Sequence, residues 1–227
     1  MKTTSSFETI VVGGLYIGEV LGALSYALDL TDGQPPGHCM RSGFIGSAIG
    51  DEIGLAGDQA TDLFYTLILK DLGCSSNAAR ICQLFLTDDL TFKHDHKLAG
   101  VTIRQTRAGL MNNSASNQPL AKRLKVVAGF LKDADGISQD LLETRWQQGY
   151  DIALEMGFSE DVALGIAGLD EHWDGGGNPL KAAGDDIPLY AQIALISQVI
   201  DVFNTSSGRD AALAEVQARS GKWFNPG

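Results

Sequence analysis

The stretch EHWDGGGNPLKAAGDDIPLYAQIALISQVIDVF, residues 171–203, decides most of the fold because it joins a distinctive loop to a long helix. In the loop, acids, a histidine and a tryptophan are followed by three glycines, an asparagine and a proline. Pro188 then stands in the first turn of an apolar helix predicted over 188–204, a position that proline tolerates. Because 159–169 also has helical periodicity, the stretch predicts a glycine-rich loop between two late helices.

Apolar residues recur at helical spacing along most of the chain, and no strand pattern stands out. Turn residues such as TDGQPPG, 31–37, separate the periodic segments. We therefore predict an all-α protein whose residues 1–227 form a single domain, with an N-terminal extension over 1–17 and a flexible loop over 105–119. The remaining predicted helices cover about 20–30, 38–53, 60–72, 74–85, 87–100, 120–132, 137–156 and 209–219.

Composition narrows the classes of partner. The chain has 227 residues, of which 44% are hydrophobic, enough for one substantial core. Its net charge of −11 argues against binding nucleic acid or an anionic membrane. Glu19 and Asp29 interrupt the first apolar stretch, which argues against a membrane span. The three cysteines are an odd, scattered set, so we expect reduced thiols and a cytoplasmic protein.

Several residues could carry chemistry, although each signal is weak alone. Lys70 and Asp71 end an apolar helix, where composition by itself favours contact with water. Asp201 lies in the apolar sequence LISQVIDVF and needs a partner if it is buried. His94 and His96 are two positions apart, so they do not share a helix face and are expected at the surface. Asp170, Glu171 and Asp174 repel one another unless a cation lies near them.

The order of these residues resembles the HD-domain superfamily and, within it, the HD-GYP proteins. The resemblance covers roughly 20–225. It is carried by the loop, which follows the family's E-x-W-D-G-x-G-Y-P, and by SGKWFNP, 220–226, which resembles the closing G-x-x-F-D-P. It implies an all-helical fold, two or three divalent metals such as iron or manganese, and hydrolysis of cyclic-di-GMP or other phosphate esters.

The resemblance carries over residue by residue, and the metal ligands are where it fails. His38, Asp71 and Asp201 match family ligands, whereas most of the other nitrogen ligands are replaced. Gln34 stands where the family has an acid. Four further positions stand where the family has histidines: Lys70, Arg145, Leu169 and Asp170.

Two of the replacements are cations, which oppose metal binding where metals should sit. Imidazole is also the ligand that suits iron, manganese or zinc, and leucine supplies nothing in its place. The hypothesis is that the Lys70 ammonium, together with Arg145, takes the electrostatic place of the missing metals between Asp71 and Asp201. Trp173 is expected to anchor the glycine loop by packing, and Asp174 to accept hydrogen bonds from its backbone amides.

Three functions follow from these positions. The first is an HD-GYP-like domain that has lost hydrolysis and regulates by binding, without a cofactor. Its ligand would be a nucleotide or other phosphate compound, a protein partner or a second copy of the chain. Its pocket would be formed by Arg145, Asp170, Glu171 and Asp174.

The alternative is an active phosphohydrolase with Lys70 and Asp71 as catalytic residues. It would hold a Mn, Fe or Mg ion through His38, Asp71 and Asp201, with Asp170 as a further oxygen ligand. The loss of most nitrogen ligands favours the first function over this alternative. A third interpretation, a structural or oligomerisation module of a longer protein, comes from the ending KWFNPG, because the family usually continues with another helix.

Overall fold

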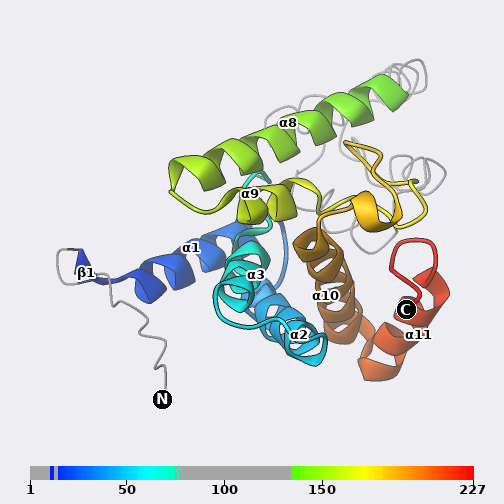
Figure 1. The fold of residues 1–227 in the computed structure, drawn as a ribbon, viewed down its shortest axis with the longest axis horizontal. Coiled ribbons are helices and arrows are strands. Elements are labelled where there is room, and N and C mark those ends of the chain that lie inside the picture. Colours follow the sequence, from blue (N-terminus) through cyan, green and yellow to red (C-terminus); the bar gives the residue numbers. More distant parts are fainter. Residues whose placement is uncertain (1–10, 13–14, 75, 77–133) are drawn as a thin grey trace, which may run out of the picture.

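The computed structural model describes residues 11–12, 15–74, 76 and 134–227 (Figure 1). The helices expected over 87–100 and 120–132, most of the one over 74–85, and the loop over 105–119 lie outside these residues. Cys82, His94 and His96 lie outside them as well.

The described part of the chain is helical, which confirms the all-α fold class. Its helices are α1 (Ile17–Thr31), α2 (His38–Glu52), α3 (Asp58–Leu69), α8 (Ala134–Glu155), α9 (Glu160–Ala167), the 3₁₀ turn η1 (Gly184–Asp186), α10 (Leu189–Ser207) and α11 (Arg209–Arg219). Two strands, β1 (Val11–Val12) and β2 (Leu15–Tyr16), pair antiparallel before α1. Neither strand was expected from the sequence, because two residues are too few to show an alternating pattern.

Two helix boundaries differ from the prediction for local reasons. Helix α1 begins at Ile17, the last residue of the expected extension, where the Glu19 carboxylate accepts a hydrogen bond from the Tyr16 amide and closes the first turn. Helix α3 was expected to run to residue 72 but ends at Leu69. The chain from Lys70 to Cys74 then forms tight turns, and this break gives Lys70 and Asp71 their directions.

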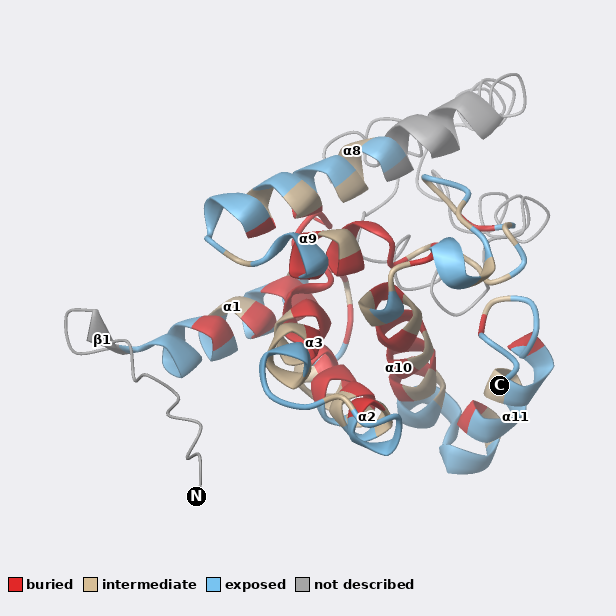
Figure 2. Ribbon diagram, viewed as in Figure 1, coloured by how far each residue is buried: buried red, intermediate tan, exposed pale blue. Residues whose placement is uncertain are grey.

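Helix α10 is the centre of the packing, because it lies against α2, α3, α9 and α11. Helix α8 runs across the top of Figure 1 and packs on α9, and α1 packs on α2 and α3. Figure 2 shows the buried faces of α3 and α10 turned toward the interior, with exposed residues on the outer helices. The functional candidates come from the start of α2, the turn after α3, the interior of α8 and α10, and the loop before α10.

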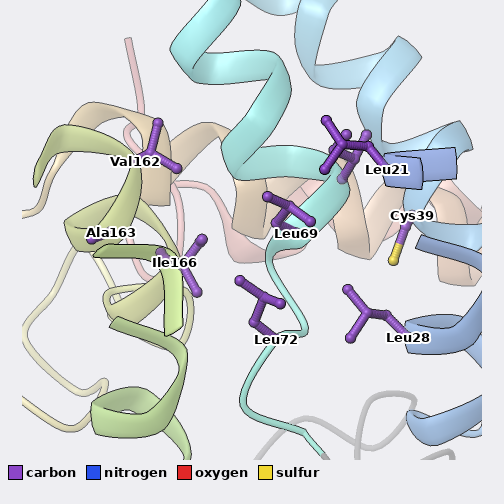
Figure 3. Packing of buried hydrophobic residues seen from close by; sticks show 10 residues of the cluster. Leu21, Leu28, Cys39, Leu69, Leu72, Val162, Ala163 and Ile166 are labelled. Carbon is purple, nitrogen blue, oxygen red and sulfur yellow. The ribbon is translucent and has the colours of Figure 1, made fainter. Parts of the chain in front are cut away.

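The main hydrophobic core joins α1, α2, α3, α8 and α9 (Figure 3). Leu69 and Leu72 belong to this core and flank the Lys70–Asp71 pair in sequence. Burying large aliphatic side chains of this kind stabilises a fold by roughly 1.5–3 kcal/mol each. The core therefore fixes the turn that carries the candidate site.

Candidate active site

The start of α2 is held by a carboxylate from α1. Gly37, the residue before the helix, has no side chain to cap it. Asp29, which is 1% exposed, supplies the cap instead: its two oxygens accept hydrogen bonds from the Gly37 amide at 2.6 Å and the Cys39 amide at 2.8 Å. Because His38 is the first residue of α2, this contact fixes the backbone that carries its imidazole.

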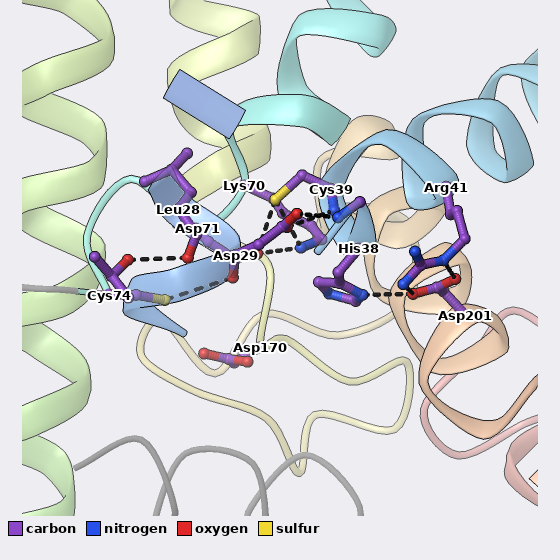
Figure 4. A network of polar contacts seen from close by, with 12 residues as sticks. Leu28, Asp29, His38, Cys39, Arg41, Lys70, Asp71, Cys74, Asp170 and Asp201 are labelled. Atoms are coloured by element: carbon purple, nitrogen blue, oxygen red, sulfur yellow. Dashed lines mark hydrogen bonds and ion pairs between the residues drawn. The ribbon is translucent and has the colours of Figure 1, made fainter. Parts of the chain in front are cut away.

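His38 and Asp201 meet between α2 and α10 (Figure 4). His38 Nδ1 lies 2.7 Å from Asp201 Oδ2, and both residues are buried. The Arg41 guanidinium also binds Asp201, with Nε 2.6 Å from Oδ1 and Nη2 3.1 Å from Oδ2. Burial raises the pKa of Asp201, but the hydrogen bonds from His38 and Arg41 outweigh this effect and lower it below its usual value. Asp201 is therefore a carboxylate in a paired, buried setting.

Lys70 and Asp71 form an ion pair in the interior. Both side chains are fully buried, and the Lys70 ammonium contacts Asp71 Oδ2. Two thiols flank the same carboxylate: Cys39 Sγ lies 3.6 Å from Oδ2 and Cys74 Sγ lies 3.5 Å from Oδ1. Burial raises the pKa of Cys39, so its thiol is protonated at neutral pH and can donate. The surface position that composition favoured for Lys70 and Asp71 is wrong, because the turn after α3 directs both side chains inward.

A group able to hold a metal ion is formed by Asp32, His38 and Asp71. One ligand atom from each lies within 4.8 Å of the others, and all three residues are buried. Asp32 was missed in the sequence, where the family's early acid was placed at Gln34. The acid in TDGQPPGH was the available signal, but only the turn between α1 and α2 brings it back to His38.

Arg145 reaches this region from α8. Its Nη1 lies 2.7 Å from Asp170 Oδ2 and its Nη2 lies 3.8 Å from Asp71 Oδ1. Burial lowers the pKa of Arg145, but neighbouring negative charge, that of Asp170 foremost, outweighs it and raises the pKa. A Cβ on Gly73 would collide with the Arg145 carbonyl oxygen, so glycine is what lets α8 approach the turn. Lys70, Arg145 and Asp170 line a common pocket.

The glycine loop carries the remaining expected residues. Asp174 Oδ1 accepts a hydrogen bond from the Gly176 amide at 2.9 Å, within the glycine turn. Glu171 is 2% exposed and accepts from the Leu180 amide at 2.6 Å. Burial raises the pKa of Glu171. Glu171 and Asp174 therefore shape the loop, while the preceding residue, Asp170, faces Arg145.

The structure thus divides the expected residues into groups. Lys70, Asp71 and Arg145 lie together, and Asp170 joins them through Arg145. Asp201 contacts His38 but is outside the group of Asp32, His38 and Asp71. The Lys70 ammonium pairs with Asp71, and the Arg41 guanidinium pairs with Asp201. The residues that sequence reasoning missed are Asp29, Asp32 and Arg41.

Residues 137–227 match the HD domain family. The chain is 46% identical over 210 residues to the 3′3′-cGAMP-specific phosphodiesterase 3 of Vibrio cholerae, a match that covers 92% of this chain and 46% of that protein. A crystal structure of a cyclic GMP-AMP specific phosphodiesterase from V. cholerae superimposes with a TM-score of 0.67 at 40% identity, again covering 92% of this chain and 46% of that one. The helical fold, the loop and these matches together place the chain in the HD-domain superfamily.

The chain spans about half the length of the relatives it matches. The expectation of a binding module that has lost hydrolysis is wrong. The overturning finding is the 46% identity to a protein that is a phosphodiesterase. The expectation relied on counting lost histidines, and that count overlooked Asp32, an oxygen donor that the α1–α2 turn supplies.

Among the residues that the structure describes, no helix combines the length and the apolar character needed to cross a bilayer.

Proposed function

We propose that this chain is a metal-dependent phosphodiesterase that hydrolyses a cyclic dinucleotide. The observation that carries the proposal is the group of Asp32, His38 and Asp71 beside the buried Lys70 ammonium and the Arg145 guanidinium. The group provides donors for a cation, and the two basic side chains provide positive charge for a phosphate. The similarity of this chain to a 3′3′-cGAMP-specific phosphodiesterase supports the choice of substrate class.

The donor set fits one small, hard divalent cation. Two carboxylates and one imidazole suit Mg²⁺ or Mn²⁺, which prefer oxygen ligands and accept nitrogen. Lys70 opposes binding, since two unit charges 4 Å apart interact by about 4 kcal/mol at an effective dielectric of 20. Asp32 and Asp71 offset this repulsion for a single ion. Where the HD-GYP pattern expects further histidines, Lys70, Leu169 and Arg145 provide no ligand, so we propose one metal position instead of two or three.

The residues of the chain have separable roles in this proposal. Asp32, His38 and Asp71 would hold the cation, which would supply Lewis-acid charge at the phosphate ester. The Lys70 ammonium pairs with Asp71 and lines the same pocket as Arg145, so in this proposal it adds positive charge beside the phosphate. Arg145, whose side chain is 21% exposed, lines the same pocket, and its guanidinium is held there by Asp170.

The wider assignments remain proposals of the same kind. The retained Glu171, Trp173, Asp174 and Gly175 support a place among the HD-GYP-like proteins. The packing of α10 against helices from both halves of the chain supports a single domain.

The experiment is hydrolysis of 3′3′-cGAMP and of a generic phosphodiester, bis(p-nitrophenyl) phosphate, with and without added Mn²⁺ or Mg²⁺. We expect metal-dependent turnover that Asp71→Ala reduces at least 100-fold, because outer-shell losses alone cost 10–100-fold and the proposal makes Asp71 a direct ligand. The matched control is Asp58→Ala, which removes an exposed acid from the first turn of α3 and should keep wild-type activity. Equal rates for the wild type and Asp71→Ala, or no turnover with any metal, would reject the proposal.

A further inference from the structure

The Arg41 guanidinium binds the Asp201 carboxylate at two points. Arg41 lies one turn after His38 on α2, and positions three apart share a helix face. Its Nε and Nη2 contact the two different oxygens of Asp201, and its Nη1 donates to the Pro36 carbonyl at 2.9 Å. The Arg41 side chain is 37% exposed, whereas that of Asp201 is 2% exposed. A bidentate contact of this type fixes both the position and the orientation of the carboxylate.

The contact between Arg41 and Asp201 determines which ring nitrogen of His38 carries the hydrogen. Asp201 accepts hydrogen bonds on both oxygens from Arg41, so it is an ionised carboxylate with no proton to donate. His38 Nδ1 lies 2.7 Å from Asp201 Oδ2, so the hydrogen in that contact belongs to Nδ1. In a neutral imidazole, a hydrogen on Nδ1 leaves Nε2 as an acceptor.

The same contact with Arg41 explains why Asp201 is absent from the group of Asp32, His38 and Asp71. Both of its oxygens are turned to the guanidinium and the imidazole. Carboxylates that bind the far nitrogen of a metal-ligating histidine are a common outer-shell arrangement, and they set the orientation of the ring.

We propose that Arg41 is a positioning residue of this site: by holding Asp201 in place, it fixes His38 in the tautomer whose Nε2 is available to a divalent cation together with Asp32 and Asp71. The part that concerns the cation rests on the proposed function, whereas the part that concerns the tautomer does not. Arg41 itself touches neither the donor group nor the pocket residues in the contacts described, so its effect is transmitted through Asp201 and His38.

The first test uses the metal-free wild-type protein labelled with ¹⁵N-histidine. The chain has only four histidines, so long-range ¹H–¹⁵N spectra can be assigned with single His→Gln variants. We expect His38 to show a protonated Nδ1 and an unprotonated Nε2 at neutral pH. A protonated Nε2 with a bare Nδ1, or an imidazolium, would overturn the proposal without any variant of Arg41 being required.

The second test changes Arg41. Arg41→Met removes the contact with Asp201, and we expect His38 to populate both tautomers and the Kd for Mn²⁺, measured by electron paramagnetic resonance, to rise 10–100-fold. Arg41→Lys keeps the charge but allows only one point of contact, so its effect should be intermediate. The matched control is Arg209→Met, which makes the same change in net charge at an exposed position of α11 and should leave both readouts unchanged.

The outcomes separate the two proposals. Unchanged tautomer and unchanged Mn²⁺ affinity in a folded Arg41→Met protein would refute the role of Arg41. If Arg41→Met does not fold, Arg41→Lys and the wild-type spectrum still decide it. A wild-type protein that binds no Mn²⁺ and hydrolyses nothing would reject the proposed function, while the His38 spectrum would continue to test the tautomer.

Discussion

Lys70 and Asp71 are neighbours in sequence and partners in space, and both are removed from water. Ionised groups in that setting are stable only as a pair, since each alone would carry an uncompensated desolvation cost. Arg145 Nη2, 3.8 Å from Asp71, is too distant to replace the ammonium fully.

Lys70→Met should therefore destabilise the metal-free protein by about 3–5 kcal/mol, because it leaves Asp71 buried without its main partner. Urea unfolding measures the change, with Lys222→Met, an exposed lysine, as the control. Added Mn²⁺ should raise the stability of Lys70→Met more than that of the wild type, because a cation beside Asp71 replaces the lost charge. A Lys70→Met protein as stable as the control would show that Asp71 is compensated by another route.

At the scale of elements, close approach between helices depends on glycines whose neighbours are side chains of other helices. Gly46 of α2 is buried, and a Cβ there would lie 2.5 Å from Leu67 Cδ2 of α3 and 2.8 Å from Ser197 Oγ of α10. Gly22 of α1 is exposed, and a Cβ there would meet nothing within 4 Å.

The two glycines should therefore respond in opposite directions to the same substitution. Gly46→Ala should cost about 1–3 kcal/mol through overpacking, whereas Gly22→Ala should stabilise the protein by roughly 0.5–1 kcal/mol because alanine loses less backbone entropy in a helix. Thermal unfolding of the two variants in parallel provides the measurement. A stabilising Gly46→Ala would mean that α2, α3 and α10 are not packed this closely.

At the scale of the whole molecule, the C-terminal residues hold the glycine loop. The Trp173 amide donates to the Trp223 carbonyl at 3.1 Å and the Asp174 amide to the Lys222 carbonyl at 2.8 Å. The His172 ring stacks on the Trp223 ring with centroids 4.1 Å apart, and the Arg219 guanidinium lies 3.9 Å from the same ring centroid. The loop and the end of the chain therefore form one packed unit.

This unit predicts a pH dependence. Burial lowers the pKa of His172 below its ordinary 6.5, although Asp170 and Asp174 partly counteract it. A depressed pKa means that the contribution of neutral His172 to stability is complete above pH 6.5 and is lost as the pH falls through the folded-state pKa. His172→Phe keeps an aromatic ring on Trp223 but cannot titrate, so the difference in unfolding free energy between it and the wild type should change between pH 7.5 and 5. A constant difference would contradict the prediction.

Helical periodicity and the glycine loop were sufficient to predict the all-α class and the approximate positions of the described helices, because these are local properties of the chain. The residues 38, 70, 71, 145 and 201 could be named from their order, since a family resemblance preserves order. The end of α3 at Leu69 could not be predicted, because it depends on packing that the apolar pattern through residue 72 does not reveal.

The partners of those residues were decided by the tertiary structure. From the sequence, Lys70 could form an ion pair with either Asp71 or Asp201. The packing of α2 against α10 places Asp201 beside Arg41 and His38. The end of α1 and the turn that follows it bring Asp32 to His38 and Asp71, and Asp29 to the start of α2. The sequence alone determined which helices form and which charged residues they carry. Only the crossing of the helices decided which charges are buried together, because ion pairing and metal ligation depend on distances of a few ångströms between segments far apart in the chain.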